Sequence, residues 1–405
     1  MNDKTILREL AKRYLETTQK PVMDERRKKW RDHNSLKARE PLIYVRGFAF
    51  REMPESQCLC EDPFLRGIEW FFRHSLYWDS LDDDAIFEPW VTVNALNVVH
   101  GWGVEIPRQY GGPRGSFKED YPLRDEADLA KLQTPAHVID EEGTAREYAL
   151  AQDVLGDILA VNLSRASAWG MWSGDISTDL GHLRGMEHFM LDMHDRPEWL
   201  RRLVKFMGDG ILNAHAQTEA AGDWGLADHQ NQAMPYAREL PDPAANARGV
   251  PRKQLWRYMS AQEFALVSPG HHEEFLLRYQ LPILEKFGLV AYGCCEDLTH
   301  KIEMLRKIPN LRRIAVSPFA DVEKCAGQIG RDYVASYRPS PVDMVAYSWD
   351  PERVRRILDR DFAALARHNC VFDVTLKDVE TVGHDPDRVR NWVRLTRERI
   401  AENVK

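Results

Sequence analysis

The sequence predicts an α/β fold in which a parallel sheet is covered by helices on both faces. In the last third of the chain, four short apolar runs alternate with amphipathic helical segments. Continuous apolar strands of this kind are typical of parallel sheets that are buried on both faces. An α/β barrel and a doubly wound sheet both fit the pattern. No G-x-G-x-x-G motif follows any of the runs, which disfavours a dinucleotide-binding sheet.

The first half of the chain contributes helices and two strands. Residues 1–20 predict an amphipathic helix because large side chains recur there at helical spacing, namely Ile6, Leu7, Leu10, Tyr14 and Leu15. Pro63, near the start of the next helical segment, is tolerated in a first turn. The other elements expected in this half are helices at 62–78, 125–153 and 197–221 and strands at 89–99 and 157–163.

The second half contains the repeating units. A possible short strand at 224–227 comes first, followed by a helix that begins with Ser268 as N-cap and Pro269 as first residue. The strands of the four units are expected at 288–295, 312–318, 333–338 and 370–377, and their helices at 297–308, 320–330, 351–368 and 385–402.

Composition limits the class of protein. The chain has 405 residues, 43% of them hydrophobic, and a formal net charge of −8. Nucleic-acid-binding proteins usually carry a basic stripe, and the dense basic run at 26–29 is expected to be a solvated helix face. No run approaches 18 consecutive apolar residues, and the N-terminal segment lacks the apolar core of a signal peptide. We therefore expect a cytoplasmic protein that binds neither nucleic acid nor a membrane.

The most informative junction is the end of the 288–295 run, which reads Tyr292-Gly293-Cys294-Cys295-Glu296. Functional residues of α/β barrels lie where strands end. Side chains alternate along a strand, so Tyr292 and Cys294 are expected on one face and Cys295 on the other, unless the chain has already turned. We predict that Cys294, Cys295 and Glu296 are catalytic and that Tyr292 binds substrate. The alternative is that two small cysteines fill space at a tight strand end.

Other strand ends offer further candidates. Asp228 is predicted to be catalytic and His229 to bind substrate, although a surface loop explains both equally well. Arg338 ends the 333–338 strand, a natural place for a guanidinium that holds a carboxylate or phenolate. Lys377 ends the last strand and is predicted to bind substrate. The alternative role for Arg338 and Lys377 is a structural ion pair. For Lys377 the partner would be the neighbouring Asp378.

Two further pairs of residues could bind ligands. Cys58 and Cys60 are spaced as C-x-C, but no second group of metal ligands is near them in the sequence. His271 and His272 lie in the first turn of a helix and are expected to be exposed to solvent.

Several segments together resemble the uroporphyrinogen decarboxylase-like superfamily. They are AYGCCEDLTHKIEMLRKIPNLRRIAVSPFADVEKCAGQIG at 291–330 and the closing segments at 376–382 and 385–402, with earlier likeness at 62–84, 125–135 and 180–204. The nearest branch is similar to the methyltransferase-like proteins of anaerobic corrinoid systems. The resemblance implies a (β/α)8 TIM barrel at 56–405, preceded by an N-terminal helical extension at 1–55.

The resemblance also implies a reaction, the O-demethylation of aryl ethers by a first methyltransferase component. Such a protein moves a methyl group from a small methoxylated, aromatic donor to the Co(I) corrinoid carried by a partner corrinoid-binding protein. Authentic uroporphyrinogen decarboxylases carry an RQAGRY-type segment, for which 44–53 is a poor substitute. The alternatives are a decarboxylase or lyase of a polycarboxylate such as a porphyrinogen, and a non-catalytic tetrapyrrole-binding barrel.

A zinc ion is part of the same expectation. Thiol-activating zinc methyltransferases of the superfamily carry His-x-Cys on this strand and a further Cys near the last strand. If Cys294 matches that Cys, Tyr292 stands at the His position, and the last strand has no Cys at its end. Zinc would then need another ligand set, for which we expect Cys294, Cys295 and Glu263.

Overall fold

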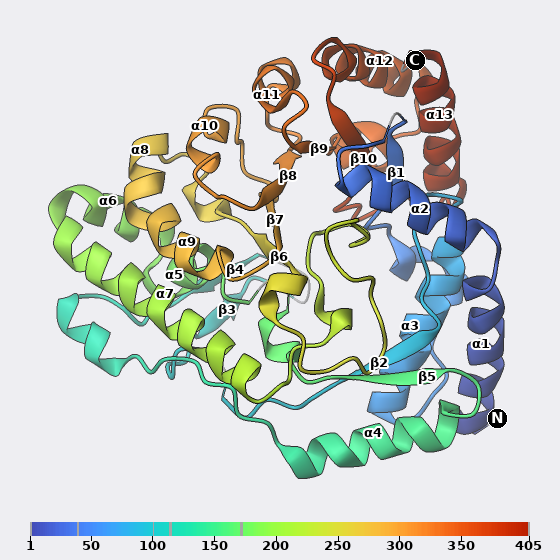
Figure 1. Ribbon diagram of the computed structural model, residues 1–405, viewed down its shortest axis with the longest axis horizontal. Helices are drawn as coiled ribbons and strands as arrows, with labels where there is room; N and C mark the ends of the chain where they lie inside the picture. The colour runs from blue at the N-terminus through green and yellow to red at the C-terminus, as the bar shows by residue number, and fades with distance from the viewer. Residues whose placement is uncertain (1, 39, 100, 113–115, 171–172, 404–405) are drawn as a thin grey trace.

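Eight parallel strands divided between two sheets form the framework of the computed structural model, which describes residues 2–38, 40–99, 101–112, 116–170 and 173–403 (Figure 1). The larger sheet has the order β1-β10-β9-β8-β7-β6, and the smaller one pairs β2 with β5. The strands are β1 (Leu42–Val45), β2 (Trp90–Asn94), β5 (Ala160–Ser164), β6 (Trp256–Met259), β7 (Leu289–Tyr292), β8 (Leu311–Val316), β9 (Val334–Tyr337) and β10 (Val371–Leu376), and an antiparallel hairpin consists of β3 (Arg108–Tyr110) and β4 (Phe117–Glu119).

Helices follow most of these strands, which confirms the predicted parallel α/β class. The α-helices are α1 (Asp3–Thr18), α2 (Val22–Asn34), α3 (Pro63–Asp79), α4 (Glu141–Leu155), α5 (Ser177–Arg184), α6 (Met186–Asp195), α7 (Pro197–Ala220), α8 (Pro269–His272), α9 (Arg278–Leu284), α10 (Ile302–Leu305), α11 (Val322–Ile329), α12 (Pro351–Arg367) and α13 (Asp387–Asn403).

Two local predictions are wrong. Within the helix expected at 125–153, a 3-10 segment at Glu126–Lys131 is followed by extended chain before α4 begins, because Pro135 cannot continue a helix. The strand expected at 224–227 is replaced by a 3-10 turn at Leu226–Asp228. The Asp228 carboxylate accepts a hydrogen bond from the Gly225 N–H there, which closes the turn.

The carboxyl ends of the strands in the larger sheet lie along one edge. In the parallel register, Val45 at the end of β1 lies opposite Leu376 at the end of β10. Met259 at the end of β6 likewise lies opposite Tyr292 at the end of β7. The segments that follow these strands therefore start at the same edge, where parallel α/β folds place their functional residues.

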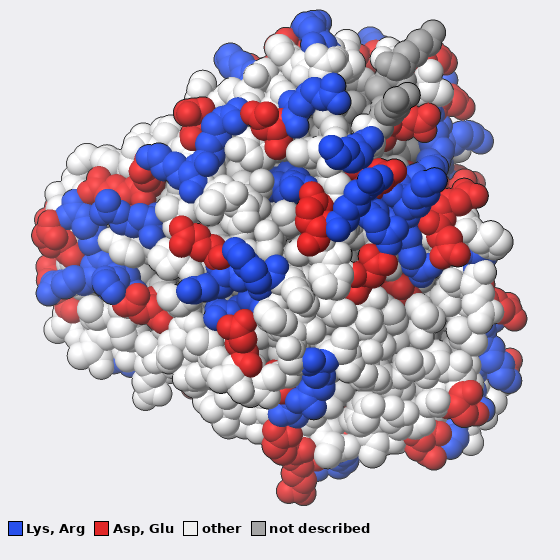
Figure 2. Space-filling view, in the orientation of Figure 1, with Lys and Arg blue, Asp and Glu red and all other residues white. Residues whose placement is uncertain are grey.

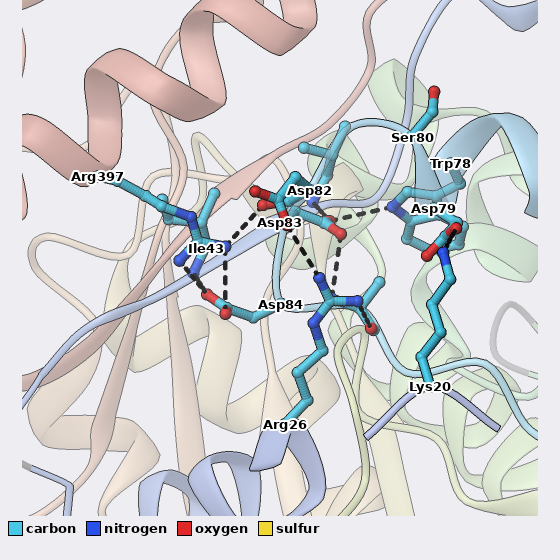
Figure 3. A network of polar contacts seen from close by, with 12 residues as sticks. Lys20, Arg26, Ile43, Trp78, Asp79, Ser80, Asp82, Asp83, Asp84 and Arg397 are labelled. Atoms are coloured by element: carbon cyan, nitrogen blue, oxygen red, sulfur yellow. Dashed lines mark hydrogen bonds and ion pairs between the residues drawn. The ribbon is translucent and has the colours of Figure 1, made fainter. Parts of the chain in front are cut away.

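The outer edge of β1 is covered by carboxylates instead of by another strand. Asp84 Oδ2 accepts from the Ile43 N–H at 2.8 Å, and Asp83 Oδ2 accepts from the Val45 N–H at 2.6 Å. Arg397 of α13 lies 3.3 Å from the same Asp84 carboxylate, which therefore joins β1 to the last helix (Figure 3). Buried backbone N–H groups at a strand edge need such partners.

The outer edge of β5 is covered in a similar way by Asn246. Its Oδ1 accepts from the Leu163 N–H at 3.0 Å and its Nδ2 donates to the Val161 carbonyl at 2.9 Å. Among the described residues, strand pairing therefore ends at β1 and β6 in one sheet and at β2 and β5 in the other. The pairing establishes a parallel α/β sheet but not a closed eight-stranded ladder.

A buried polar layer joins α2 to the middle of the larger sheet. His33 Nε2 on α2 lies 3.1 Å from Asp373 Oδ2, and Arg313 of β8 lies 2.9 Å from the same oxygen. The Ser336 hydroxyl donates to the other oxygen of Asp373 at 3.0 Å.

The helix predicted at 1–20 is confirmed as α1. β1 precedes residue 55 but pairs with β10, so this strand is part of the larger sheet. The division of the chain into an extension at 1–55 and a barrel at 56–405 stays a prediction.

The basic run at 26–29 lies on α2. Arg26 is buried and donates to the Ala85 carbonyl at 2.9 Å, so the expectation of a fully solvated face is wrong for this residue. Arg27 lies 3.1 Å from Glu88, and the two lysines that follow are exposed. Basic and acidic side chains are interspersed over much of the face in Figure 2. No helix in the described part of the chain has the length and apolar character needed to cross a membrane.

Candidate active site

Gly293 lets the chain turn sharply where β7 ends. Its φ is +100°, and a Cβ there would lie 2.6 Å from Leu298 Cδ1 and 3.0 Å from Ala315 Cβ. Because of this turn, the sulfur atoms of Cys294 and Cys295 lie side by side, 3.6 Å apart, and not on opposite faces of a strand. Cys294 is buried and Cys295 is half-buried.

Lys377 connects this turn to the end of β10. Its Nζ lies 3.1 Å from Cys294 Sγ and 3.2 Å from Cys295 Sγ. Asp378 Oδ2 lies 2.8 Å from the same ammonium and 3.7 Å from Cys295 Sγ. The structure therefore brings together three residues that sequence analysis singled out on two strands, and the predicted Lys377–Asp378 pair is present as well.

Arg338, which follows β9, holds the backbone of the turn. Its guanidinium donates to the Cys294 carbonyl at 2.7 Å and to the Gly293 carbonyl at 3.3 Å. The side chain is buried, and its Nε has no hydrogen-bond partner among the described residues. Arg338 is thus a neighbour of the dithiol, with carbonyl oxygens as its acceptors, and its role in substrate binding stays a prediction.

These neighbours determine the charge of the dithiol. The pKa of Cys294 is lowered, first by the hydrogen bond from the Cys295 thiol and then by the positive charges of Arg338 and Lys377. The pKa of Cys295 is raised because it donates that hydrogen bond and is partly buried. Burial and Arg338 disfavour the charge on Lys377, but the negative charges of Cys294 and Asp378 outweigh them and raise its pKa. The pair is a thiolate and a thiol beside an ammonium ion.

Glu296 lies next to the dithiol but bonds to the backbone. Its Oε2 accepts from the Cys294 N–H at 2.7 Å, and its Oε1 accepts from the Ala261 N–H at 2.9 Å. The carboxyl group is fully buried, and burial raises its pKa. Since both oxygens are used in this way, Glu296 fixes the turn against the segment that follows β6.

The remaining predicted residues bind other partners. Ser164 donates to Asp228 at 2.8 Å, and His229 Nδ1 accepts from the Trp256 N–H at 3.2 Å, so both residues stabilise the segment between β5 and β6. The Tyr292 hydroxyl donates to Gln280 of α9 at 2.8 Å.

Two more residues differ from the expectation. His272 is buried, 3.0 Å from the Tyr292 hydroxyl, so its predicted exposure is wrong. The reason is that the first turn of α8 packs against β7. Glu263 accepts a hydrogen bond from Ser177 of α5. No hydrogen bond or ion pair in the described part of the chain links Glu263 to the dithiol.

The donor set does not fit the zinc site expected from sequence. Among the described residues, no group of three His, Cys, Asp or Glu side chains is arranged to hold a metal ion. The position in contact with both sulfurs is taken by the Lys377 ammonium, whose positive charge would repel a cation there. We therefore derive no step through zinc.

Two aspartates with raised pKa values, one buried and one half-buried, were missed by sequence analysis. Asp175 accepts from the Thr178 N–H at 2.9 Å and from the Ser260 hydroxyl at 3.1 Å, and burial raises its pKa to about 7. Asp179 has its pKa raised by burial and lines a cavity of about 580 Å³ with Trp102, Trp169 and other residues. Aspartate is favoured just before a helix because its side chain can accept from N–H groups of the first turn, as Asp175 does from Thr178, so the sequence carried a weak signal for it.

The fold is similar to that of a solved methyltransferase from Methanosarcina mazei. The two structures superpose with a TM-score of 0.52 and 12% sequence identity, over 92% of this chain and 98% of the other. No protein-family model matches the sequence, and no curated protein matches it. At this identity the likeness establishes a shared fold, and the reaction has to be argued from the site.

Proposed function

We propose that the protein is a methyltransferase that moves a methyl group from a small methoxylated, aromatic donor to the Co(I) corrinoid of a partner protein. The observation that carries the proposal is the group formed by Lys377, Cys294 and Cys295 at the carboxyl edge of the larger sheet. Parallel α/β folds place their catalytic residues at this edge. The likeness of fold to a methyltransferase and the sequence resemblance at 291–330 support the reaction class.

Cleavage of a methyl ether requires stabilisation of the leaving oxygen. As the carbon–oxygen bond breaks, its electron pair stays on the oxygen, which develops negative charge. The Lys377 ammonium is positioned by both sulfurs and by Asp378, and it can donate a hydrogen bond and a proton to that oxygen. Arg338 and Glu296 hold the turn, which keeps the two sulfurs beside the ammonium in place. The Co(I) centre carried by the partner supplies the nucleophile.

Exposed apolar side chains around the same edge support docking of a partner protein. Leu266, Phe319, Val342 and Tyr347 belong to segments that follow β6, β8 and β9, and each is more than half exposed, Leu266 by 92%. Several exposed large apolar side chains on segments that follow neighbouring strands are typical of a surface that binds a partner. A partner protein that presents its wide, flat corrinoid to the carboxyl edge of the larger sheet would cover these four side chains.

The contact between β7 and β10 residues supports closure of the sheets into a barrel. Two strands, β8 and β9, separate β7 from β10 in the sheet order. In a flat sheet the outer two strands of these four would lie about 14 Å apart, which is beyond the combined reach of a lysine and a cysteine. The contact between Lys377 and Cys294, which lie just after β10 and β7, is favoured by curvature of the sheet, and we infer that the two sheets are arcs of one barrel.

A second candidate reaction is decarboxylation of a polycarboxylate such as a porphyrinogen. The observation that favours it is the presence of two buried cations, Arg338 and Lys377, at one edge of the sheet. Guanidinium and ammonium groups are the usual partners of substrate carboxylates. The Arg338 guanidinium already donates to the carbonyls of Gly293 and Cys294, and the solved structure of similar fold is a methyltransferase, which makes this the weaker candidate.

One anaerobic assay distinguishes the two reactions. The protein is incubated with a reduced corrinoid protein and a methoxyarene, and loss of Co(I) absorbance and release of the phenol are followed. Methyl transfer predicts both signals in equal amounts and their loss in Lys377→Met. A parallel incubation with uroporphyrinogen is analysed for carbon dioxide. Release of carbon dioxide without any change in Co(I) would overturn the proposal in favour of the second candidate.

A further inference from the structure

The two adjacent thiols have a geometry that suits chemistry of their own. Their sulfur atoms are 3.6 Å apart, and Lys377 contacts both of them at 3.1 and 3.2 Å. Cys295 is half-buried, so a small molecule can reach one sulfur of the pair from solvent. Redox-sensitive cysteines combine three features, namely a stabilised thiolate, access to solvent and a second thiol within reach. All three are present at this turn.

A second pair of cysteines in the same chain lacks the first of these features, a stabilised thiolate. Cys58 and Cys60 are separated by one residue, and Cys58 is half-buried like Cys295. The Glu69 carboxylate accepts from the Cys60 N–H at 2.7 Å, and Arg66 donates to the Cys60 carbonyl instead of to a sulfur, so burial and Glu69 raise the pKa of both thiols. A negative neighbour disfavours a thiolate, whereas the positive Lys377 favours one. The chain thus contains an internal control for the effect of the ammonium.

We propose that Cys294 and Cys295 form a peroxide-sensitive site, in which the pair is oxidised to a reversible disulfide between consecutive residues. The oxidant is a hydroperoxide, of which hydrogen peroxide is the simplest example. The proposal concerns the thiols of the proposed active site, and the oxidation step itself requires no methyl donor.

Oxidation of the dithiol takes place in two steps. The proton shared by the two sulfurs passes to Cys294, and the Cys295 thiolate attacks one peroxide oxygen. The oxygen–oxygen bond breaks, hydroxide leaves, and Cys295 becomes a sulfenic acid. Cys294 then attacks the Cys295 sulfur, the sulfur–sulfur bond forms, and water leaves with the Cys294 proton. Two electrons pass from the dithiol to the peroxide.

The product would be reduced easily. Consecutive Cα atoms lie about 3.8 Å apart, which is shorter than the separation found in most disulfides and therefore imposes strain. Strained disulfides have more oxidising potentials and are typical of regulatory sites. Formation of the bond removes the thiolate that holds Lys377 in place. If the proposed function is right, oxidation therefore stops methyl transfer until a thiol reductant restores the site.

Peptide mass spectrometry tests the proposal without reference to activity. The intact protein is treated with a few equivalents of hydrogen peroxide at pH 7, then unfolded in urea with iodoacetamide at pH 8, and digested with trypsin. The expected product is the 287–301 peptide, unlabelled and lighter by two hydrogen atoms than the reduced peptide. Dithiothreitol added before iodoacetamide should restore labelling of both sulfurs. The 52–66 peptide, which contains Cys58 and Cys60, should be labelled in both samples.

Variants separate the roles of the residues. Lys377→Met should slow disulfide formation by about tenfold or more, because the reaction depends on the thiolate fraction. Cys295→Ser should leave Cys294 without a partner, so that no peptide two hydrogens lighter appears. The proposal is overturned if the 287–301 and 52–66 peptides are oxidised at equal rates, or if 287–301 stays fully labelled. Neither result bears on the methyl-transfer assay, so failure of one proposal is distinct from failure of the other.

Discussion

Replacing Lys377 by methionine tests the electrostatics of the site directly. The substitution removes an ammonium that lies 3.1 Å from Cys294 Sγ and 3.2 Å from Cys295 Sγ, and it keeps a side chain of similar length. A hydrogen bond to a charged group contributes about 1.5–3 kcal/mol, and 1.36 kcal/mol corresponds to one pKa unit. The pKa for the first deprotonation of the dithiol should therefore rise by about 1 to 2 in Lys377→Met.

The measurement is the rate of iodoacetamide labelling of the 287–301 peptide between pH 4 and pH 10. The matched control is Asp378→Asn, which removes a carboxylate 2.8 Å from the ammonium and should shift the labelling curve slightly towards lower pH. The free energy of unfolding should also depend on pH, in the direction set by the lowered pKa of Cys294. The pKa of the thiol is lowered in the folded state, so its contribution is fully present above the ordinary value near 9 and is lost as the pH falls towards the folded pKa. A labelling curve that does not move in Lys377→Met would refute the assigned role of the ammonium.

Three further substitutions test other parts of the structure. Asp373→Asn leaves the buried Arg313 without its carboxylate and should cost about 3–5 kcal/mol in urea unfolding at pH 7; because the pKa of Asp373 is lowered, the difference should narrow as the pH falls below about 4. Asp175 has a raised pKa of about 7, so Asp175→Asn should gain stability relative to the original protein as the pH rises from about 4 to 7, by at most about 4 kcal/mol. Gly293→Ala should lose about 1–3 kcal/mol and slow methyl transfer, because a Cβ at φ +100° meets Leu298; unchanged melting would contradict this account of the turn.

Much of the fold could be predicted from the chain itself, because its strands and helices have strong periodic patterns. The continuous apolar runs became β7 to β10, and the amphipathic segment at 351–368 became α12. What could not be predicted is how the sheet edges are completed. The N–H groups of β1 bond to the side chains of Asp83 and Asp84, and no local pattern distinguishes such carboxylates from ordinary polar residues in a turn.

The candidate site was only partly predictable for a related reason. The strand-end rule identified Cys294, Cys295 and Lys377 separately, but their contact depends on how closely the segments after β7 and β10 approach each other, and two strands separate β7 from β10 in the sheet. The alternation rule placed the two sulfurs on opposite faces, and it failed because Gly293 turns the chain before the first cysteine. Tyr292 was assigned to the substrate from its place at the strand end; its hydroxyl donates to Gln280 of α9, a partner that its position in the sequence does not indicate. Buried polar side chains are paired by tertiary packing, which spacing along the chain does not encode.

The presence of an ammonium where zinc was expected has consequences for the proposed chemistry. A lysine beside a thiolate lowers the pKa of the sulfur and can stabilise a leaving oxygen, which are two of the tasks that zinc performs. An ammonium cannot bind the oxygen as a ligand, so it acts only by charge and hydrogen bonding, and its three N–H groups must be shared. In this site Cys294, Cys295 and Asp378 already use them. A donor oxygen must therefore displace one of these partners, and the most exposed of the three is the Asp378 carboxylate. Removal of that carboxylate in Asp378→Asn should consequently lower the KM for the donor more than it changes kcat, whereas an unchanged KM would mean that the donor binds Lys377 from another side.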